Sequence, residues 1–75
     1  MSVKDIVYEE IKKYTDFEFC DNSLFKEDLC INSYKAVQLM MGLERRGVVF
    51  KAGMLPAIKK VSDLIDCLEF KKVNG

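Results

Sequence analysis

Residues 33–46, SYKAVQLMMGLERR, form the stretch of this chain that most clearly predicts a regular element. The stretch holds no proline, one glycine and several strong helix formers, and Gly47 follows a basic pair at its end. Cations favour the C-terminal turn of a helix, and glycine is common just beyond it. The pattern therefore predicts a helix over residues 33–46, with Ser33 suited to its N-cap.

The apolar residues of this predicted helix fall on two stripes. One recurs at spacings of three and four and is predicted to face the core: Ala36, Leu39, Met40 and Leu43. An adjacent stripe consists of Tyr34, Val37 and Met41. It is either further core or a surface that docks partners, for which soft Met and amphipathic Tyr side chains are well suited.

Outward from this helix, helical spacing of apolar residues predicts two more helices, over residues 3–14 and 61–70, and Ser2 with Asp5 resembles a capping box. Pro56 limits residues 54–58 to a short helical turn. Residues 48–50 are expected to be an extended, buried connector, because so short a strand lacks an evident partner. The apolar connection before Ser33 must be pinned onto the core or form a short turn. We expect a bundle of three main helices and one minor helix.

Composition excludes several classes of function. Twelve Lys and Arg residues balance twelve Asp and Glu residues, so no overall positive field attracts nucleic acid. The 75 residues include no histidine, which removes Ser-His and Cys-His nucleophiles and the commonest general base. We therefore expect a protein that is not an enzyme.

The cysteines and the apolar runs bear on compartment. Cys20, Cys30 and Cys67 have no CxxC spacing, and we expect them to be small, semi-buried hydrophobes in a reducing compartment, with no metal site. No apolar run approaches the roughly 20 residues that span a bilayer, and the N-terminal MSVKDIVYEE is charged where a signal peptide is apolar. We expect a cytoplasmic monomer that does not bind membranes.

The sequence around Ser33 resembles the acyl and peptidyl carrier protein family. The core motif of that family is (E/D)-(D/E)-L-G-x-(D/N)-S-L, and the matching places here hold Glu27, Asp28, Leu29, Asn32 and Ser33. The likeness continues through Leu39, Leu43, Glu44, Gly47 and residues 48–50, and KKVSDLIDCLE resembles the closing helix of the family. It covers about the whole chain, which is expected to be one carrier domain over residues 1–75.

This resemblance implies an all-α fold, the small four-helix carrier bundle with three main helices and one short helix. It also implies that Ser33 carries covalent 4′-phosphopantetheine, transferred from coenzyme A by a phosphopantetheinyl transferase, with Asn32 and Tyr34 as flanking motif residues. The thiol of such an arm holds acyl or aminoacyl groups as thioesters for loading and condensing enzymes. The cofactor, not the protein, supplies the chemistry.

Three motif positions differ from the usual family residues: Cys30 replaces glycine, Asn32 replaces aspartate and Tyr34 replaces leucine. The I-N-S variant resembles carriers of polyketide, nonribosomal peptide or related specialised pathways. If the outer face of this helix docks partners, the partner-binding residues are expected to be Tyr34, Lys35, Val37, Gln38, Met41 and Arg45. Fatty acid synthase carriers are typically acidic where this chain has Lys35, Gln38 and Arg45, so we expect partners with a less basic or more apolar docking site.

Two other functions are open at this stage. One is an unmodified, small helical module for protein–protein interaction. The other is a helix-turn-helix DNA binder, which is disfavoured because its recognition helix would hold few cations beyond Lys35, Arg45 and Arg46.

Overall fold

The first helix, α1, spans Val3–Ile11 in the computed structural model, which describes residues 1–51 and 58–71. The predicted capping box is present, because Ser2 Oγ accepts from the Asp5 backbone N–H and the Asp5 carboxylate accepts from the Ser2 N–H, both at 3.2 Å. The helix buries Ile6, Val7 and Ile11. Regular helix ends at Ile11, and residues 12–14 continue only as a turn, so the predicted range of 3–14 was too long.

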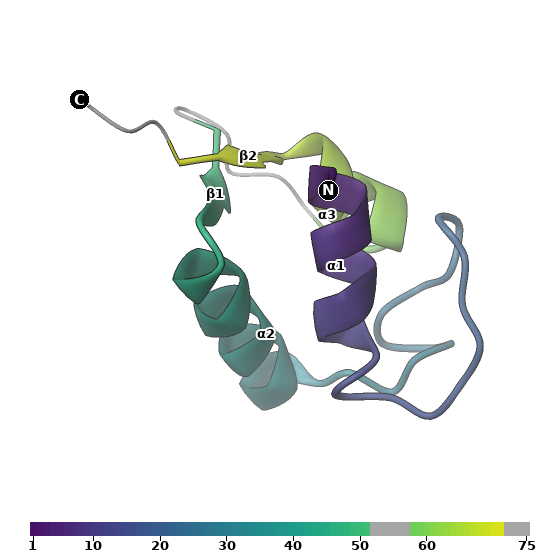
Figure 1. Ribbon diagram of the computed structural model, residues 1–75. Coiled ribbons are helices and arrows are strands. Elements are labelled where there is room, and N and C mark those ends of the chain that lie inside the picture. The colour runs from purple at the N-terminus through teal and green to yellow at the C-terminus, as the bar shows by residue number, and fades with distance from the viewer. Residues whose placement is uncertain (52–57, 72–75) are drawn as a thin grey trace.

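The central helix, α2, spans Ser33–Arg45, close to the predicted range. Its N-cap is Asn32 rather than Ser33, since Asn32 Oδ1 accepts from the Lys35 backbone N–H at 2.9 Å. Gly47, just past the helix, has a φ of +82°, a left-handed conformation that glycine adopts without a Cβ clash. In Figure 1, α2 lies along one side of the molecule and packs beside α1.

The fold is not the all-α four-helix bundle that the sequence predicted. Three helices are accompanied by a two-stranded antiparallel sheet, in which β1, Val48–Phe50, pairs with β2, Leu68–Phe70. The Lys51 N–H donates to the Cys67 carbonyl at 2.8 Å, and the Lys71 N–H donates to the Gly47 carbonyl at 2.7 Å. The third helix, α3, covers only Val61–Asp66, and the predicted short helix at residues 54–58 falls almost wholly outside the described residues.

The predicted helix over residues 61–70 was too long, because Leu68 fits both a helical and a strand pattern. It lies four residues after Leu64 and seven after Val61, so it continues the buried stripe of α3 if the chain remains helical. In the structure Leu68 is 3% exposed and Phe70 48% exposed, and β2 gains backbone partners on β1 instead. The expected connector at residues 48–50 is therefore a strand whose partner lies far along the chain.

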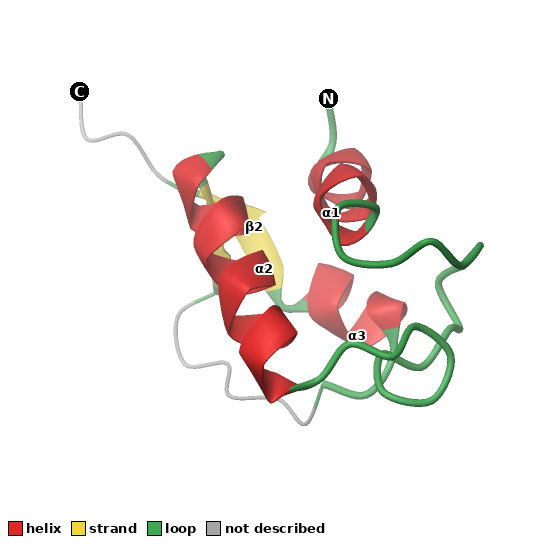
Figure 2. Cartoon of the chain, turned by 90° about the horizontal axis from the view of Figure 1, so that it is seen from below, coloured by secondary structure: helices red, strands yellow, loops and turns green. Residues whose placement is uncertain are grey.

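The long connection between α1 and α2 is pinned onto the core, as expected. Leu29 and Ile31 are buried at 1% and 4% exposure. Tyr8 of α1 packs its ring on Phe19 and donates its hydroxyl to Asp21 Oδ1 at 2.5 Å. Figure 2 shows this loop extending beyond the helices on the side away from α2.

Backbone hydrogen bonds tie the later part of this connection to the start of α3. The Phe25 N–H donates to the Lys59 carbonyl and the Val61 N–H to the Ser23 carbonyl, both at 3.0 Å, and Leu24 forms an isolated bridge with Lys60. Residues 23–25 and the entrance to α3 are therefore held together as one wall of the molecule.

One buried carboxylate joins α1 to the end of α2. Glu10 is 2% exposed, and its Oε2 lies 2.7 Å from Lys13 Nζ and 3.2 Å from Arg46 Nη1. Arg46 also reaches Glu9, Nη2 to Oε1 2.8 Å. A buried charge is tolerated when it is paired in this way.

The hydrophobic core draws on every described element. Its buried members are Ile6, Val7, Ile11, Leu29, Ile31, Leu39, Leu43, Val48, Val61, Leu64 and Leu68. Leu39 and Leu43 thus confirm the core stripe of α2, with Ala36 and Met40 packed against it. No helix in residues 1–51 and 58–71 is long and apolar enough to cross a membrane.

The cysteines are all free, but they do not share the expected half-buried environment. Cys67 is buried, whereas Cys20 and Cys30 are exposed. Cys30 has a φ of +55°, and it points outward between the buried residues Leu29 and Ile31. The backbone conformation, rather than apolar packing, defines its position.

Candidate functional site

The site begins with Ser33 at the first position of α2. Because the Asn32 side chain caps the helix, the Ser33 hydroxyl is not needed for that role. Ser33 is exposed, and its hydroxyl forms no hydrogen bond within the described part of the chain. With respect to the described residues it is therefore an unbonded hydroxyl at the N-terminal end of a 13-residue helix.

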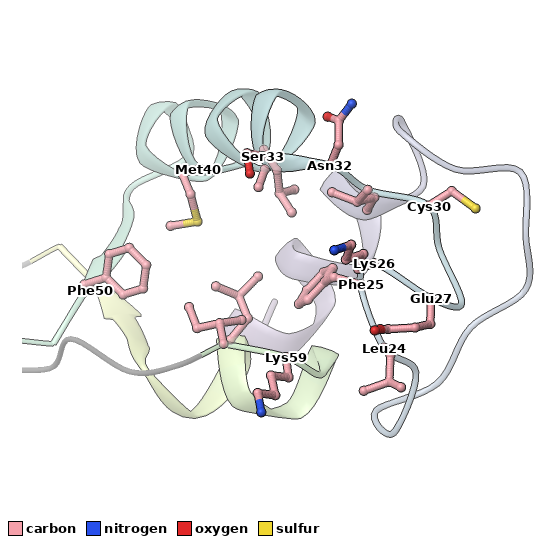
Figure 3. A pocket seen from close by; sticks show the side chains of 15 residues that line it. Leu24, Phe25, Lys26, Glu27, Cys30, Asn32, Ser33, Met40, Phe50 and Lys59 are labelled. Atoms are coloured by element: carbon pink, nitrogen blue, oxygen red, sulfur yellow. The ribbon is translucent and has the colours of Figure 1, made fainter.

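Next to this hydroxyl is a cavity of about 780 Å³. Figure 3 shows Ser33 at its upper edge beneath α2, with Met40 and Phe50 on one side and Phe25 across from them. Asn32, by contrast, projects away from the cavity. The lining is mainly apolar and comes from α2, β1, the loop before α2, the segment leading into α3, and α3 itself: Leu24, Phe25, Ile31, Ala36, Leu39, Met40, Phe50, Ile58 and Leu64.

Polar groups gather at the rim of the cavity. Besides Ser33 and Asn32 they are Lys26, Glu27, Cys30 and Lys59. The first turn of α2 carries no acidic side chain, and the N-terminal N–H groups of a helix favour a nearby anion. This environment suits a serine oxygen that bears a phosphodiester, and it leaves room beside that oxygen for an apolar group.

The wall opposite α2 is fixed by local hydrogen bonds. The Asp28 carboxylate accepts from the Leu24 N–H at 2.8 Å, and the Ile31 N–H donates to the Phe25 carbonyl at 2.8 Å. These bonds turn the loop so that Phe25 faces the cavity while Leu29 enters the core. Asp28, one of the acidic motif residues, therefore has a structural role here.

The partner-binding residues predicted from the sequence lie on the solvent side of α2, apart from the cavity. Tyr34, Val37 and Met41 are 70%, 59% and 50% exposed, so the interpretation of their stripe as further core was wrong. Arg45 is exposed, and Lys35 and Gln38 are half-buried. The structure brings Asn32 and Ser33 to the cavity and leaves the others on the outer face of the same helix.

Sequence reasoning missed most of the cavity wall. Leu24, Phe25, Phe50 and Ile58 come from segments with no shared local pattern, and Lys59 entered the sequence analysis only as the first residue of the run that resembles the family's closing helix. The one available signal was the unusually apolar connection before Ser33, which indicated packing but not a cavity. No protein family, curated protein sequence or solved structure matches this chain.

Proposed function

We propose that this chain is a carrier protein whose Ser33 receives 4′-phosphopantetheine and tethers acyl or aminoacyl intermediates as thioesters. The observation that supports this most directly is the Ser33 hydroxyl, which has no hydrogen-bond partner among residues 1–51 and 58–71 and is exposed at the start of α2 on the rim of an apolar cavity. The protein acts as a substrate for partner enzymes and has no catalysis of its own. Its pathway is polyketide, nonribosomal peptide or related specialised biosynthesis.

The local geometry around the motif supports the proposal independently of the overall fold. Cys30 occupies the motif position where carriers usually have glycine, and its φ of +55° is a conformation that glycine adopts readily. Asn32 performs by its side-chain oxygen the capping that an aspartate at this place would also perform. Two of the three departures from the family motif therefore keep the backbone role of the residue they replace.

The test is covalent modification in solution. The purified chain is incubated with coenzyme A and a broad-specificity phosphopantetheinyl transferase, and intact mass is measured. We expect the gain of a single phosphopantetheine group, no gain in Ser33→Ala, and an unchanged gain in the control variants Ser23→Ala and Ser62→Ala. Modification of Ser33→Ala would move the site elsewhere, and an unmodified parent beside a modified reference carrier would leave the interaction module as the better function.

A further inference from the structure

The cavity beside Ser33 has the size and the lining of a site for a small molecule. Its volume of about 780 Å³ lies within the range of about 300 to 1,000 Å³ in which proteins commonly hold such ligands. Most of the side chains that line it are apolar, and they converge from separate segments of the fold. Such a cavity favours a ligand with an apolar body, because binding removes the apolar surface of both from water.

The charged groups at the rim of this cavity are placed unevenly. They belong to Lys26, Glu27 and Lys59. Figure 3 shows the Lys26 ammonium between Asn32 and the Phe25 ring, whereas the Lys59 ammonium points away from the cavity. The Glu27 carboxylate lies below the Phe25 ring in this view. The part of the rim between the start of α2 and the Phe25 ring is therefore cationic.

The Lys26 ammonium has no carboxylate partner among residues 1–51 and 58–71, where the ion pairs involve Lys4, Lys13 and Arg46. Lys26 is exposed, so its apolar stem lies over the rim while its charge remains in water. An anionic head group at this rim meets the ammonium while both groups keep much of their hydration. Little desolvation therefore opposes the pairing, and an exposed ion pair of this kind raises affinity by up to about fivefold.

We propose that the cavity binds a free alkyl carboxylate without a covalent bond. The alkyl chain enters the apolar interior between Phe25, Met40 and Phe50, and the carboxylate pairs with Lys26 at the rim. The proposal goes beyond the carrier function, because this ligand needs neither the phosphopantetheine arm nor a partner enzyme. It assigns Lys26 the role of selecting the charge of the head group.

Two other classes of ligand fit the cavity less well. An alkyl amine places a second cation beside Lys26, and like charges in contact oppose binding. A sugar or another strongly polar metabolite places hydroxyl groups against Leu39, Met40 and Leu64, where they lose their hydrogen bonds to water without replacement. The apolar lining and the rim cation together therefore favour an amphiphilic anion.

The test is a titration of the isotopically labelled, unmodified chain with decanoate and with decylamine, which carry opposite charges at neutral pH. Binding is followed by amide chemical shifts and by nuclear Overhauser contacts from the ligand methylenes. We expect contacts with the Phe25 ring and the Met40 methyl group, and about fivefold tighter binding of decanoate than of decylamine. Octanoate and hexanoate should bind more weakly than decanoate, by roughly threefold to fourfold for each methylene removed.

Matched variants separate the head-group contact from the apolar cavity. Lys26→Met removes the ammonium but keeps an apolar side chain, so it should weaken decanoate binding about fivefold and abolish the preference over decylamine. Lys12→Met, the same change at an exposed lysine outside the cavity lining, should keep both. Ala36→Leu fills part of the cavity and should weaken both ligands alike, with circular dichroism as the check on folding. The dependence on chain length in the parent tests the cavity even where Ala36→Leu does not fold.

Equal affinity of the parent for decanoate and decylamine, affinity that does not rise with chain length, or ligand contacts confined to the outer face of α2 would each overturn the proposal. Since the chain is unmodified throughout, the result does not depend on whether Ser33 accepts phosphopantetheine. Failure of decanoate to bind leaves the carrier function standing, and failure of modification at Ser33 leaves this site standing.

Discussion

The carboxylate of Glu10 occupies the space that a side chain at position 42 would need, because a Cβ on Gly42 would collide with Glu10 Oε1. Glycine in the middle of α2 weakens that helix by about 1 kcal/mol relative to alanine. Here its absence of a side chain lets the buried carboxylate of α1 approach the backbone of α2. The contact explains why a poor helix former lies inside the best-defined helix of the chain.

Gly42→Ala is therefore expected to destabilise the protein despite the better helix propensity of alanine. The ion pairs to Lys13 and Arg46 hold the Glu10 carboxylate in place, and we expect a loss of about 1 to 2 kcal/mol in the free energy of unfolding, measured by urea denaturation. In the Glu10→Ala background the same substitution should be neutral or stabilising. An equal effect in both backgrounds would show that Glu10 does not determine the requirement for glycine.

Acid should weaken the protein in part through Glu10. Burial raises the pKa of this carboxyl, but the hydrogen bonds from Lys13 and Arg46 together outweigh burial, so its pKa lies below the ordinary value of 4.5. A lowered folded-state pKa contributes stability above the unfolded-state value, and that stability is lost as pH falls through the folded-state pKa. When urea unfolding is measured at pH 7 and again below pH 4.5, the free energy of unfolding should fall more for the parent than for Glu10→Gln. Parallel losses would assign the acid sensitivity to other carboxylates.

The Tyr8 hydroxyl is expected to stabilise the loop between α1 and α2. Burial, followed by the hydrogen bond to Asp21, raises the pKa of Tyr8 to about 12, so the hydroxyl remains protonated and donates throughout the neutral range. Tyr8→Phe should cost about 1 to 2 kcal/mol in thermal or urea unfolding, since the acceptor is charged. Tyr34→Phe, at a side chain 70% exposed, is the control and should unfold like the parent.

Helix capping is expected to depend on Asn32, and covalent modification on the neighbouring Ser33. Asn32→Ala removes the side-chain oxygen that accepts from the Lys35 N–H and should cost about 1 kcal/mol of stability. Ser33→Ala should leave the free energy of unfolding within about 0.5 kcal/mol of the parent value, because the Ser33 side chain has no cap bond to lose. The reverse ranking in urea denaturation would restore Ser33 as the N-cap.

The two-stranded sheet gives a direct spectroscopic prediction. Slow hydrogen exchange is expected at the Lys51 and Lys71 amides, which donate to Cys67 and Gly47 across the strands. Nuclear Overhauser spectra should also show contacts between the Hα atoms of Val48 and Phe70 and between those of Phe50 and Leu68. Sequential helical contacts continuing from α3 to Phe70 would contradict the sheet and return the C-terminal segment to a helix.

Local sequence patterns correctly predicted several features of this protein. The capping box of α1, the extent of α2, the glycine stop at Gly47 and the burial of Leu39 and Leu43 all depend on residues within a few positions of one another. For these features, helix propensity, capping and apolar spacing act over the same short range that a sequence pattern reports.

The remaining features depend on packing between distant segments and could not be predicted from local patterns. Leu68 fits a helix and a strand equally well, and the choice depended on backbone partners at Val48–Phe50, which no local pattern contains. The cavity beside Ser33 likewise needs Phe25, Phe50 and Ile58 to converge from separate segments. The sequence also did not predict whether Tyr34 is buried or exposed, because two adjacent apolar stripes on one helix look alike until the core covers one of them. Long-range packing resolves such ties, since it buries one of two locally equivalent arrangements.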